Sequence, residues 1–381
     1  MKLVVGTTSY PRPEMSYAGS FVAQWRAALE HAGVSSLVLR PRGTQGKQAD
    51  VEYKTWGKLL LSAGAPDLLA QSPITQGFNG LLQSLSIARV VAQHAHKGDL
   101  FVGHWLLPWG LCLPKRTPSH LYAHGSDIAL LEQLPRQLAN PMIRRIDSTA
   151  QGISFVSSHL KERYLKLLGQ APHANLSITP MGVEESPRNE AFYQDLMTFK
   201  GKRKLVAALG RHVPIKGLDL LIRSAHQLPD LCLVIAGDGP ETPALKTLSQ
   251  RLEIPVRFTG AFTPNARTAL LDAADVVVQP SRHLGTRQEG SPVTVREAIN
   301  HGTPCILSDT QGHLDFEGSG VIRFFPQGNV DGLAHILRTE LDELITDGSK
   351  ARALEHQGRF TWSRQIEAHL MCLNTSLNRA A

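Results

Sequence analysis

Residues 204–217 read KLVAALGRHVPIKG, and this stretch decides the fold class. Its first six residues, Lys204–Leu209, form an almost continuous apolar run that predicts a buried β-strand. Gly210 ends the run with a turn, and the amphipathic segment Leu218–His226 then predicts a helix. A strand that passes through a glycine turn into a helix is the repeating unit of a parallel α/β sheet.

The same unit recurs along the chain. In the second half we expect further strands at Leu231–Ala236, Val256–Phe258, Val276–Gln279, Cys305–Ser308 and Val321–Phe325. The helices expected there are Pro243–Leu252, Ala266–Asp272, Val293–His301 and Val330–Leu344. In the first half we expect strands at Leu3–Thr7, Ser36–Leu39, Leu100–Gly103, His120–Ala123 and Ile153–Ser157, with helices such as Phe21–Ala32, Leu82–Ala95 and His159–Leu168. This alternation predicts an α/β protein with two doubly wound Rossmann-like domains facing a cleft.

The domain boundary is expected where prolines and polar residues interrupt the pattern, between Pro180 and Lys204. We therefore predict a first domain over residues 1–185 and a second domain over residues 186–358. Residues 359–381 predict a helix that packs back on the first domain, because apolar side chains recur there at helical spacing: Trp362, Ile366, Leu370 and Leu373.

The composition indicates a cytoplasmic globular protein. The N-terminal apolar run is too short for a signal peptide, and no run approaches the roughly 18 apolar residues of a membrane span. The cysteines lie far apart, as buried thiols do in a reducing compartment: Cys112, Cys232, Cys305 and Cys372.

Positive charge is concentrated in the first half of the chain. Residues 1–180 contain 18 Lys and Arg against 10 Asp and Glu, whereas residues 181–381 contain 22 against 23. A solvated surface is the default explanation, and peripheral contact with the inner face of an anionic membrane is the second. The apolar, lysine-containing segment Tyr53–Leu69 favours an ordinary helix over an interfacial one. No dense basic run or nucleic-acid motif is present, so we expect no nucleic-acid partner.

A candidate ligand site lies in residues 285–300, GTRQEGSPVTVREAIN. A polar loop runs into the expected helix, and the exposed amides at a helix start, here those of Val293 and Thr294, form an anion site. Glu289 and Glu297 flank this start, and a carboxylate can accept two hydroxyl hydrogen bonds from a sugar diol. Two acids eight positions apart also occur by chance, so the loop and the helix start carry the prediction.

Arg211 and Lys216 follow the strand Lys204–Leu209 directly. Two cations at one strand end can neutralise a diphosphate and stabilise it as a leaving group. The alternative for both is a solvated loop. The neighbouring motif IAGDGP, residues 235–240, lacks the third glycine of a dinucleotide fingerprint and predicts a tight turn into a helix.

The first half offers weaker candidates. His124, in YAHGSD, ends an expected strand and could hydrogen-bond a substrate hydroxyl, although a lone histidine is more often structural. His104 and Trp105 lie in GHWLLPWG, where core packing is favoured over stacking on a sugar. Gly19 could let backbone approach a phosphate.

Taken together, the motifs resemble the GT-B-fold retaining glycosyltransferases of family 4. The resemblance is strongest from Leu205 to Gly312 and rests on the motifs GRHVPIKG, IAGDGP, FTGAF, ADVVVQPS, EGSPVTVREA and HGTPCILSD. The first half matches through HWLLPWG, HGSD, VSS and PMGV. Pro292 and Arg296 depart from the family pattern, which puts the identity of the donor sugar in question.

The resemblance implies that residues 1–185 form the acceptor-side domain and residues 186–358 the nucleotide-sugar-binding domain, and it implies a role for each matching position. Arg211 and Lys216 match the pair that holds the donor diphosphate, Glu289 the acid on the donor sugar, and Glu297 the acid on the ribose. Gly290 and Ser291 match the loop amides, His124 a histidine near the sugar and the acceptor, and Gly19 a glycine facing the phosphates.

The implied reaction transfers a hexose, with retention, from a nucleoside diphosphate sugar to a glycan or lipid-linked acceptor, as in bacterial surface polysaccharide or glycolipid biosynthesis. Uridine diphosphate is favoured over guanosine diphosphate on family frequency. No acidic cluster suggests an essential metal. The alternatives are a sugar-nucleotide epimerase or hydrolase, a non-catalytic partner subunit, and a nicotinamide-dependent dehydrogenase, which the incomplete fingerprint disfavours.

Overall fold

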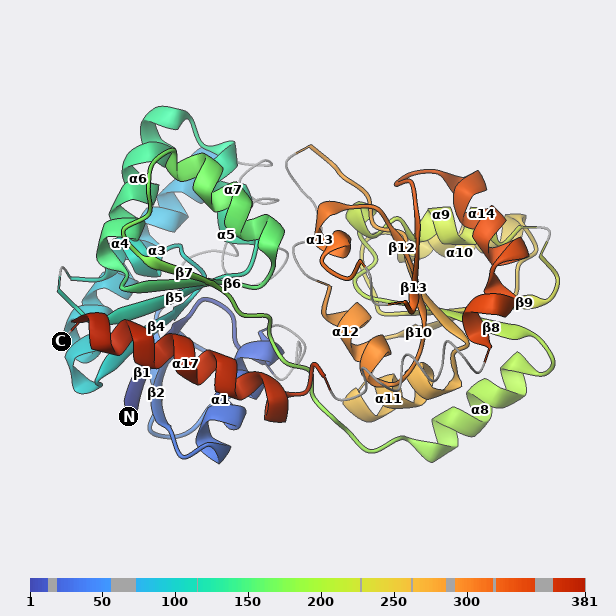
Figure 1. The fold of residues 1–381 in the computed structure, drawn as a ribbon, viewed down its shortest axis with the longest axis horizontal. Helices are drawn as coiled ribbons and strands as arrows, with labels where there is room; N and C mark the ends of the chain where they lie inside the picture. Colours follow the sequence, from blue (N-terminus) through green and yellow to red (C-terminus); the bar gives the residue numbers. More distant parts are fainter. Residues whose placement is uncertain are drawn as a thin grey trace. The chain divides into compact units, whose positions relative to one another are not determined.

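The computed structural model describes residues 1–12, 19–55, 73–114, 116–226, 228–261, 263–285, 292–317, 320–346 and 359–380. The chain forms two compact units (Figure 1). The first contains Met1–Gly182 together with Trp362–Ala381, and the second contains Val183–Thr361. The first unit is therefore made from two separate parts of the sequence.

The first unit is built on a seven-stranded sheet in the order β3-β2-β1-β4-β5-β6-β7. Each strand pairs with its neighbours in parallel, as β1 does with β2 and β4. The strands are β1 Lys2–Thr7, β2 Ser35–Pro41, β3 Val51–Tyr53, β4 Leu100–His104, β5 Ser119–Ala123, β6 Gly152–Phe155 and β7 Asn175–Ile178. The helices are α1 Ser20–His31, α3 Pro73–His94, η1 Ala95–Lys97, α4 Trp109–Cys112, α5 Ser126–Gln133, α6 Arg136–Thr149, α7 Ser158–Leu168 and α17 Trp362–Ala380.

Helix α17 completes the first unit, where it lies alongside α1 (Figure 1). Its fully buried His369 accepts hydrogen bonds at Nδ1 from Trp25 Nε1 (3.2 Å) and from the Tyr122 hydroxyl (2.9 Å). The Nε2 atom of the same ring donates to the Pro180 carbonyl at 3.0 Å. Trp25 has only a donor, so these contacts fix His369 in its neutral Nε2–H form. The helix is thus attached to α1, β5 and the end of the segment that follows β7.

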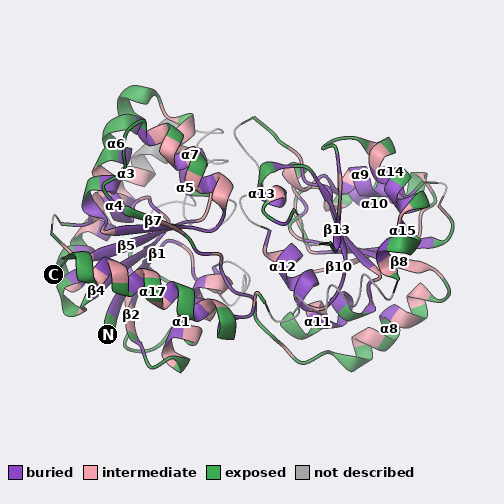
Figure 2. Cartoon of the chain, in the orientation of Figure 1, coloured by how far each residue is buried: buried purple, intermediate pink, exposed green. Residues whose placement is uncertain are grey.

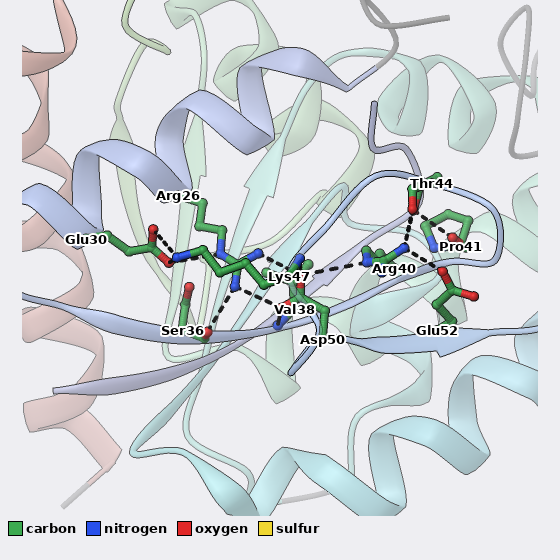
Figure 3. A network of polar contacts seen from close by, with 10 residues as sticks. All are labelled: Arg26, Glu30, Ser36, Val38, Arg40, Pro41, Thr44, Lys47, Asp50 and Glu52. Carbon is green, nitrogen blue, oxygen red and sulfur yellow. Dashed lines mark hydrogen bonds and ion pairs between the residues drawn. The ribbon is translucent and has the colours of Figure 1, made fainter. Parts of the chain in front are cut away.

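A buried ion-pair network fixes the β2–β3 connection against α1 (Figure 3). The Asp50 carboxylate is fully buried and receives two hydrogen bonds from Arg26, at 2.7 and 2.8 Å. Arg40 lies 3.7 Å from Asp50 and also pairs with Glu52 at 2.7 Å. A paired carboxylate of this kind tolerates burial because both of its oxygens are satisfied.

The second unit contains a six-stranded sheet in the order β10-β9-β8-β11-β12-β13, and its strands also pair in parallel. The strands are β8 Lys204–Leu209, β9 Leu231–Ala236, β10 Val256–Gly260, β11 Val276–Gln279, β12 Cys305–Ser308 and β13 Ile322–Phe325. The helices are α8 Glu190–Lys200, η2 Pro214–Lys216, α9 Leu218–Ser224, α10 Thr242–Arg251, α11 Pro264–Ala273, α12 Val293–Asn300, α13 Gln311–Leu314, α14 Val330–Thr339 and α15 Leu341–Ile345.

The strands β8, β9, β11 and β12 of this sheet are buried on both faces (Figure 2). Alternate residues of β8 belong to two separate apolar cores: Leu205 to one and Val206 to the other. The first core includes residues of α8, α11 and α12, and the second includes residues of α9, α10, α14 and α15. Strands that are apolar on both faces, as the sequence predicted, therefore form a doubly wound sheet.

Candidate active site

In the second unit, the direction in which successive strands are added reverses between β8 and β11. Ligands of doubly wound sheets bind beyond the carboxyl ends of the strands at such a point. The two strand ends are joined there, because the Gln279 side-chain amide donates to the Leu209 carbonyl at 2.9 Å. The loops that follow these two strands carry the cations and acids singled out in the sequence.

The loop after β8 holds Lys216 close to the strand end. Gly210 adopts φ 145°, and a Cβ atom at this residue would lie 3.3 Å from Lys216 Cε and 3.6 Å from Nζ. The side chain of Lys216 therefore folds back over the Gly210 backbone. Lys216 is half-buried, whereas Arg211 is exposed. The predicted pair thus sits at the carboxyl edge of the sheet, with the lysine ordered by the turn that contains it.

The loops after β8 and β11 are bonded to one another. The Arg282 amide donates to the Ile215 carbonyl at 2.8 Å, and Arg282 forms an ion pair with Asp219 at the start of α9. Gly217 has φ 60°, and a Cβ atom there would lie 2.0 Å from the Pro280 carbonyl oxygen. Only glycine permits this approach. The loop that bears Lys216 is therefore fixed against the first part of the segment that leads to Glu289.

The acid Glu289 and the loop residues Gly290 and Ser291 lie outside the described residues. Helix α12 begins at Val293, directly after Pro292, as the sequence predicted. Val293 and Thr294 form its first turn and are half-buried.

Glu297, the second predicted acid, lies in the second turn of α12 and is 7% exposed. Its carboxylate pairs with Arg267 of α11, a partner that the sequence did not indicate. Both side chains line a cavity of about 220 Å³ within the second unit. Asn300 also lines it, and within the described part of the chain the buried Nδ2 atom of Asn300 has no hydrogen-bond partner. Glu297 therefore faces a polar cavity with one carboxylate oxygen held by an arginine.

The segment IAGDGP forms a tight turn that supports the loop after β8, the cation loop, which carries Arg211 and Lys216. His212 donates its amide to the Asp238 carbonyl at 2.9 Å, and a Cβ atom on Gly239 would lie 2.4 Å from the His212 carbonyl oxygen. Helix α10 begins directly afterwards, at Thr242. The predicted turn into a helix is confirmed, and its glycines are required by close backbone packing.

Glu241, between that turn and α10, was not singled out by the sequence. Burial raises the pKa of its carboxyl group, the charge of Asp219 raises it further, and Arg282 opposes both. These three residues are distant in sequence, and the tertiary fold alone brings their charges into interaction beside the Lys216 loop.

In the first unit, the direction of strand addition reverses between β1 and β4, and His104 and His124 lie at the ends of β4 and β5. His104 Nδ1 and His124 Nε2 are 3.1 Å apart. The ring of Trp105 lies 4.9 Å from that of His124. Trp105 adopts φ 76°, which is unusual for a residue other than glycine, and its amide bonds the Tyr122 carbonyl at 2.8 Å. His124 is therefore packed and bonded in place and is not an isolated residue.

Asp127 holds the two histidine-bearing turns together. Its buried carboxylate accepts from the amides of Leu106 (2.8 Å), Gly125 (2.9 Å) and Ile128 (3.0 Å). Burial raises the pKa of Asp127, and these backbone donors counteract the rise. One carboxylate thus ties the turn after β4 to the turn after β5.

Gly19 lies beside the same group of residues. It has φ 71° and directly precedes α1, whose N-terminus has no side-chain cap among the described residues. A Cβ atom at Gly19 would lie 2.4 Å from the Ser9 carbonyl oxygen. Two residues further on, the ring of Phe21 lies 4.8 Å from that of His124. The structure therefore brings Gly19 and His124, predicted separately, to one edge of the sheet.

Within the described ranges, no group of three or more His, Cys, Asp or Glu residues could hold a metal ion. In the same ranges, no helix combines the length and the apolar character needed to cross a membrane. The segment from Trp56 to Leu69, weighed as an interfacial helix, lies outside the described residues.

The sequence profile of the family described as glycosyl transferases group 1 matches residues 193–360. The GDP-mannose-dependent alpha-(1-6)-phosphatidylinositol monomannoside mannosyltransferase of Mycobacterium tuberculosis is 28% identical over 362 residues, which is 90% of this chain and 88% of that protein. This chain is a group 1 glycosyltransferase. The mannosyltransferase of the same description from Mycolicibacterium smegmatis is 29% identical over 250 residues, which cover 62% of the group 1 glycosyltransferase described here and 63% of the relative.

Anabaena HepE, solved in complex with UDP, matches the fold of the group 1 glycosyltransferase with a TM-score of 0.73 at 17% identity, over 98% of this chain and all of HepE. The fold is therefore of the GT-B type, as the sequence resemblance implied. The family profile spans the loops after β8 and β11 and the whole of α12, so the matched region contains Arg211, Lys216 and Glu297.

Proposed function

We propose that this glycosyltransferase transfers a hexose from a nucleoside diphosphate sugar to a glycan or lipid-linked acceptor, with retention of the anomeric configuration. The observation that carries the proposal is the placement of Lys216 and Arg211 at the carboxyl edge of β8, in a loop bonded to the segment that leads to Glu289. Two cations in one loop at this point of a doubly wound sheet suit a diphosphate.

Lys216 and Arg211 are assigned to the diphosphate, where they stabilise the charge that develops as the sugar departs. Glu289 is assigned to the hydroxyls of the donor sugar and Glu297 to those of the ribose. Arg267 supports the second assignment, because it holds one carboxylate oxygen of Glu297 and so orients the group. The amides of Gly290, Ser291, Val293 and Thr294 are assigned to the sugar and phosphates.

In the first unit, Gly19 at the uncapped start of α1 is assigned to a phosphate, and His124 to a hydroxyl of the sugar or acceptor. Retention is assigned to same-face substitution, in which the leaving phosphate takes the acceptor proton. No metal is required by this scheme, because the cations of the chain balance the diphosphate charge.

GDP-mannose is the first donor to test, since relatives at 28–29% identity are described as GDP-mannose-dependent. A UDP-linked hexose, which family frequency alone favoured, is the second. The same relatives act on a phosphatidylinositol-based glycolipid, which supports a lipid-linked acceptor. The excess of basic residues in the first half supports peripheral contact with the cytoplasmic face of an anionic membrane.

Calorimetric titration with GDP, UDP and ADP identifies the nucleotide, since a productive site binds one of them at least about tenfold more tightly than the others. The preferred sugar nucleotide is then incubated with phosphatidylinositol monomannoside, with octyl mannoside, or without acceptor. Product that forms only with acceptor supports transfer. Equal turnover of the donor without acceptor would establish a hydrolase or epimerase instead.

Vesicle flotation tests the membrane contact separately. We expect binding to vesicles that contain phosphatidylglycerol at low salt, and release as the salt concentration rises. Neutral phosphatidylcholine vesicles serve as the control. A protein that stays with neither kind of vesicle at low salt would contradict the membrane assignment and leave the transfer assignment intact.

A further inference from the structure

The imidazole rings of His104 and His124 lie edge to edge. Their planes differ by 12° and their centroids are 5.3 Å apart, while Nδ1 of His104 is 3.1 Å from Nε2 of His124. A nitrogen–nitrogen distance this short at that centroid separation requires the two rings to lie nearly in one plane. One of the two nitrogens must therefore donate a hydrogen bond to the other, and the tautomers of the two rings decide which nitrogen is the donor.

The remaining nitrogen of His104 decides between the two arrangements. His104 is fully buried, and its Nε2 atom has no hydrogen-bond partner among the residues that the structure describes. If His124 were the donor, the proton of neutral His104 would sit on Nε2 and would be a buried N–H group without an acceptor. If His104 is the donor, Nε2 is only an unused lone pair. Orphaned N–H groups are rarer than under-used acceptors in folded proteins, so the second arrangement is favoured.

Both rings are neutral in this setting. Burial lowers the pKa of His104 well below its ordinary value, and the neighbouring histidines lower it further. Burial also lowers the pKa of His124, to about 3. A neutral imidazole has one N–H group, so the direction of the His104–His124 bond fixes where the proton of His124 resides.

The rings cannot easily rearrange, because each is packed against two further aromatic rings. Tyr122 lies parallel to His104 at a centroid distance of 5.1 Å, and Trp25 meets the His104 ring edge-on at 4.6 Å. Phe21 and Trp105 contact His124 from α1 and from the turn after β4. The pair is therefore pre-organised by the core of the first unit.

We propose that His104 is a positioning residue that donates its Nδ1 proton to His124 Nε2 and so fixes His124 as the Nδ1–H tautomer, which presents a hydrogen-bond donor to the substrate. The inference deepens the role given to His124 under the proposed function and rests on it. Among the described residues, His104 is the only hydrogen-bond partner of His124, so Nδ1–H remains for the ligand. His124 then recognises an oxygen lone pair, and it does not serve as a proton acceptor.

Nitrogen-15 NMR of the histidine-labelled full-length protein, without substrate, tests the tautomer directly. We expect the bound proton of His124 on Nδ1 and a bare Nε2, with the His124 signals assigned by their loss in His124→Phe. In His104→Phe, which keeps a ring but no donor, we expect the proton of His124 to redistribute to Nε2. His104→Asn keeps an N–H near the Nδ1 position and should restore the Nδ1–H form. A wild-type proton on Nε2 would overturn the proposal, whatever reaction the protein catalyses.

Kinetics of the transfer assay test the consequence. His104→Phe should lower kcat about tenfold while changing the KM for the sugar nucleotide less than about twofold, and His104→Asn should recover most of the loss. The double variant with His124→Phe should be no slower than His124→Phe alone, because both changes remove one interaction. His120→Asn controls for a general effect on the core. His120 is a buried histidine of β5, the strand that precedes His124, and its ring bonds Ser376 and Ser154 instead of His124. Losses that multiply in the double variant would contradict the proposal. If His104→Phe does not fold, the nitrogen-15 spectra of the wild-type protein and of His104→Asn decide.

Discussion

Gly237 lies against the carbonyl oxygen of Gly210, and a Cβ atom at residue 237 would stand 1.9 Å from that oxygen. Gly237 also has φ 127°, and the Gly210 amide donates to Ala236 at 2.9 Å. The turns after β8 and β9 are therefore interlocked through two glycines. Because Lys216 folds back over Gly210, the shape of the cation loop depends on a residue that touches no substrate in the proposed scheme.

Gly237→Ala should destabilise the second unit by at least about 2 kcal/mol, from backbone strain and from displacement of the Gly210 carbonyl. It should also weaken nucleoside diphosphate binding in the folded fraction. Urea unfolding and calorimetric titration measure the two effects. Gly328→Ala is the matched control, since Gly328 has φ 77° and no atom of the described residues lies within 4 Å of its Cβ position. Equal effects of the two substitutions would show that the contact with Gly210 is unimportant.

Lys216→Ala should lower kcat/KM for transfer by about two to three orders of magnitude, because the leaving diphosphate loses a positioned cation. The fold should be unaffected, which thermal unfolding checks. Lys202→Ala, an exposed lysine that precedes β8, removes the same charge and should leave activity within about twofold. Full activity in Lys216→Ala would refute the assignment of the donor site.

Glu297→Gln tests the ribose assignment through the ligand. Affinity for the preferred nucleoside diphosphate should fall about tenfold, because a charged acceptor for the ribose hydroxyls becomes neutral. The wild-type protein should bind the 2′-deoxy nucleotide about as weakly, whereas Glu297→Gln should no longer distinguish the two ligands. Glu253→Gln, in an exposed residue beyond α10, serves as the control. Continued discrimination by Glu297→Gln would place the ribose elsewhere.

The first unit should lose stability as the pH falls below about 6.5. Burial lowers the pKa of His120 to about 3 and that of His369 to about 4, so the folded state holds both in the neutral form. The unfolded chain takes up protons at about pH 6.5, and the folded state does so only near pH 3–4, so stability decreases between these values. Scanning calorimetry from pH 7 to pH 4.5 measures the slope. It should be shallower in His369→Gln and unchanged in Met371→Gln, which alters an exposed, non-titrating residue of the same helix. Identical slopes in all three proteins would contradict the prediction.

Strands of the second unit could be predicted closely from the sequence. β8, β9, β11 and β12 have the expected bounds because their apolar runs are continuous and end at glycine, proline or polar residues. β3 was not predicted, since Val51–Tyr53 is three residues long and carries a charge at its centre. Helix α8 was not predicted. It lies in the polar segment interpreted as the domain boundary, and only Leu196 of this helix is fully buried. The expected helix Val330–Leu344 is broken in two, with Glu340 between α14 and α15.

The pairing of site residues could not be read from local patterns. Glu297 and Arg267 are 30 residues apart on different helices, and His104 and His124 follow different strands. A motif indicates that a side chain lies near a strand end, but its partner depends on how neighbouring elements pack. The family resemblance supplied roles for individual residues, and the structure supplied the contacts that orient them.

The attachment of α17 has a consequence for biosynthesis. The ribosome produces the sheet of the first unit first, but the helix that covers Trp25 and Tyr122 is made only after the entire second unit. Until then, that apolar face has no cover from its own chain, whereas the second unit is contiguous and can close without waiting. We therefore expect the order of folding to run opposite to the order of synthesis, with the earlier-made half dependent on chaperones for longer.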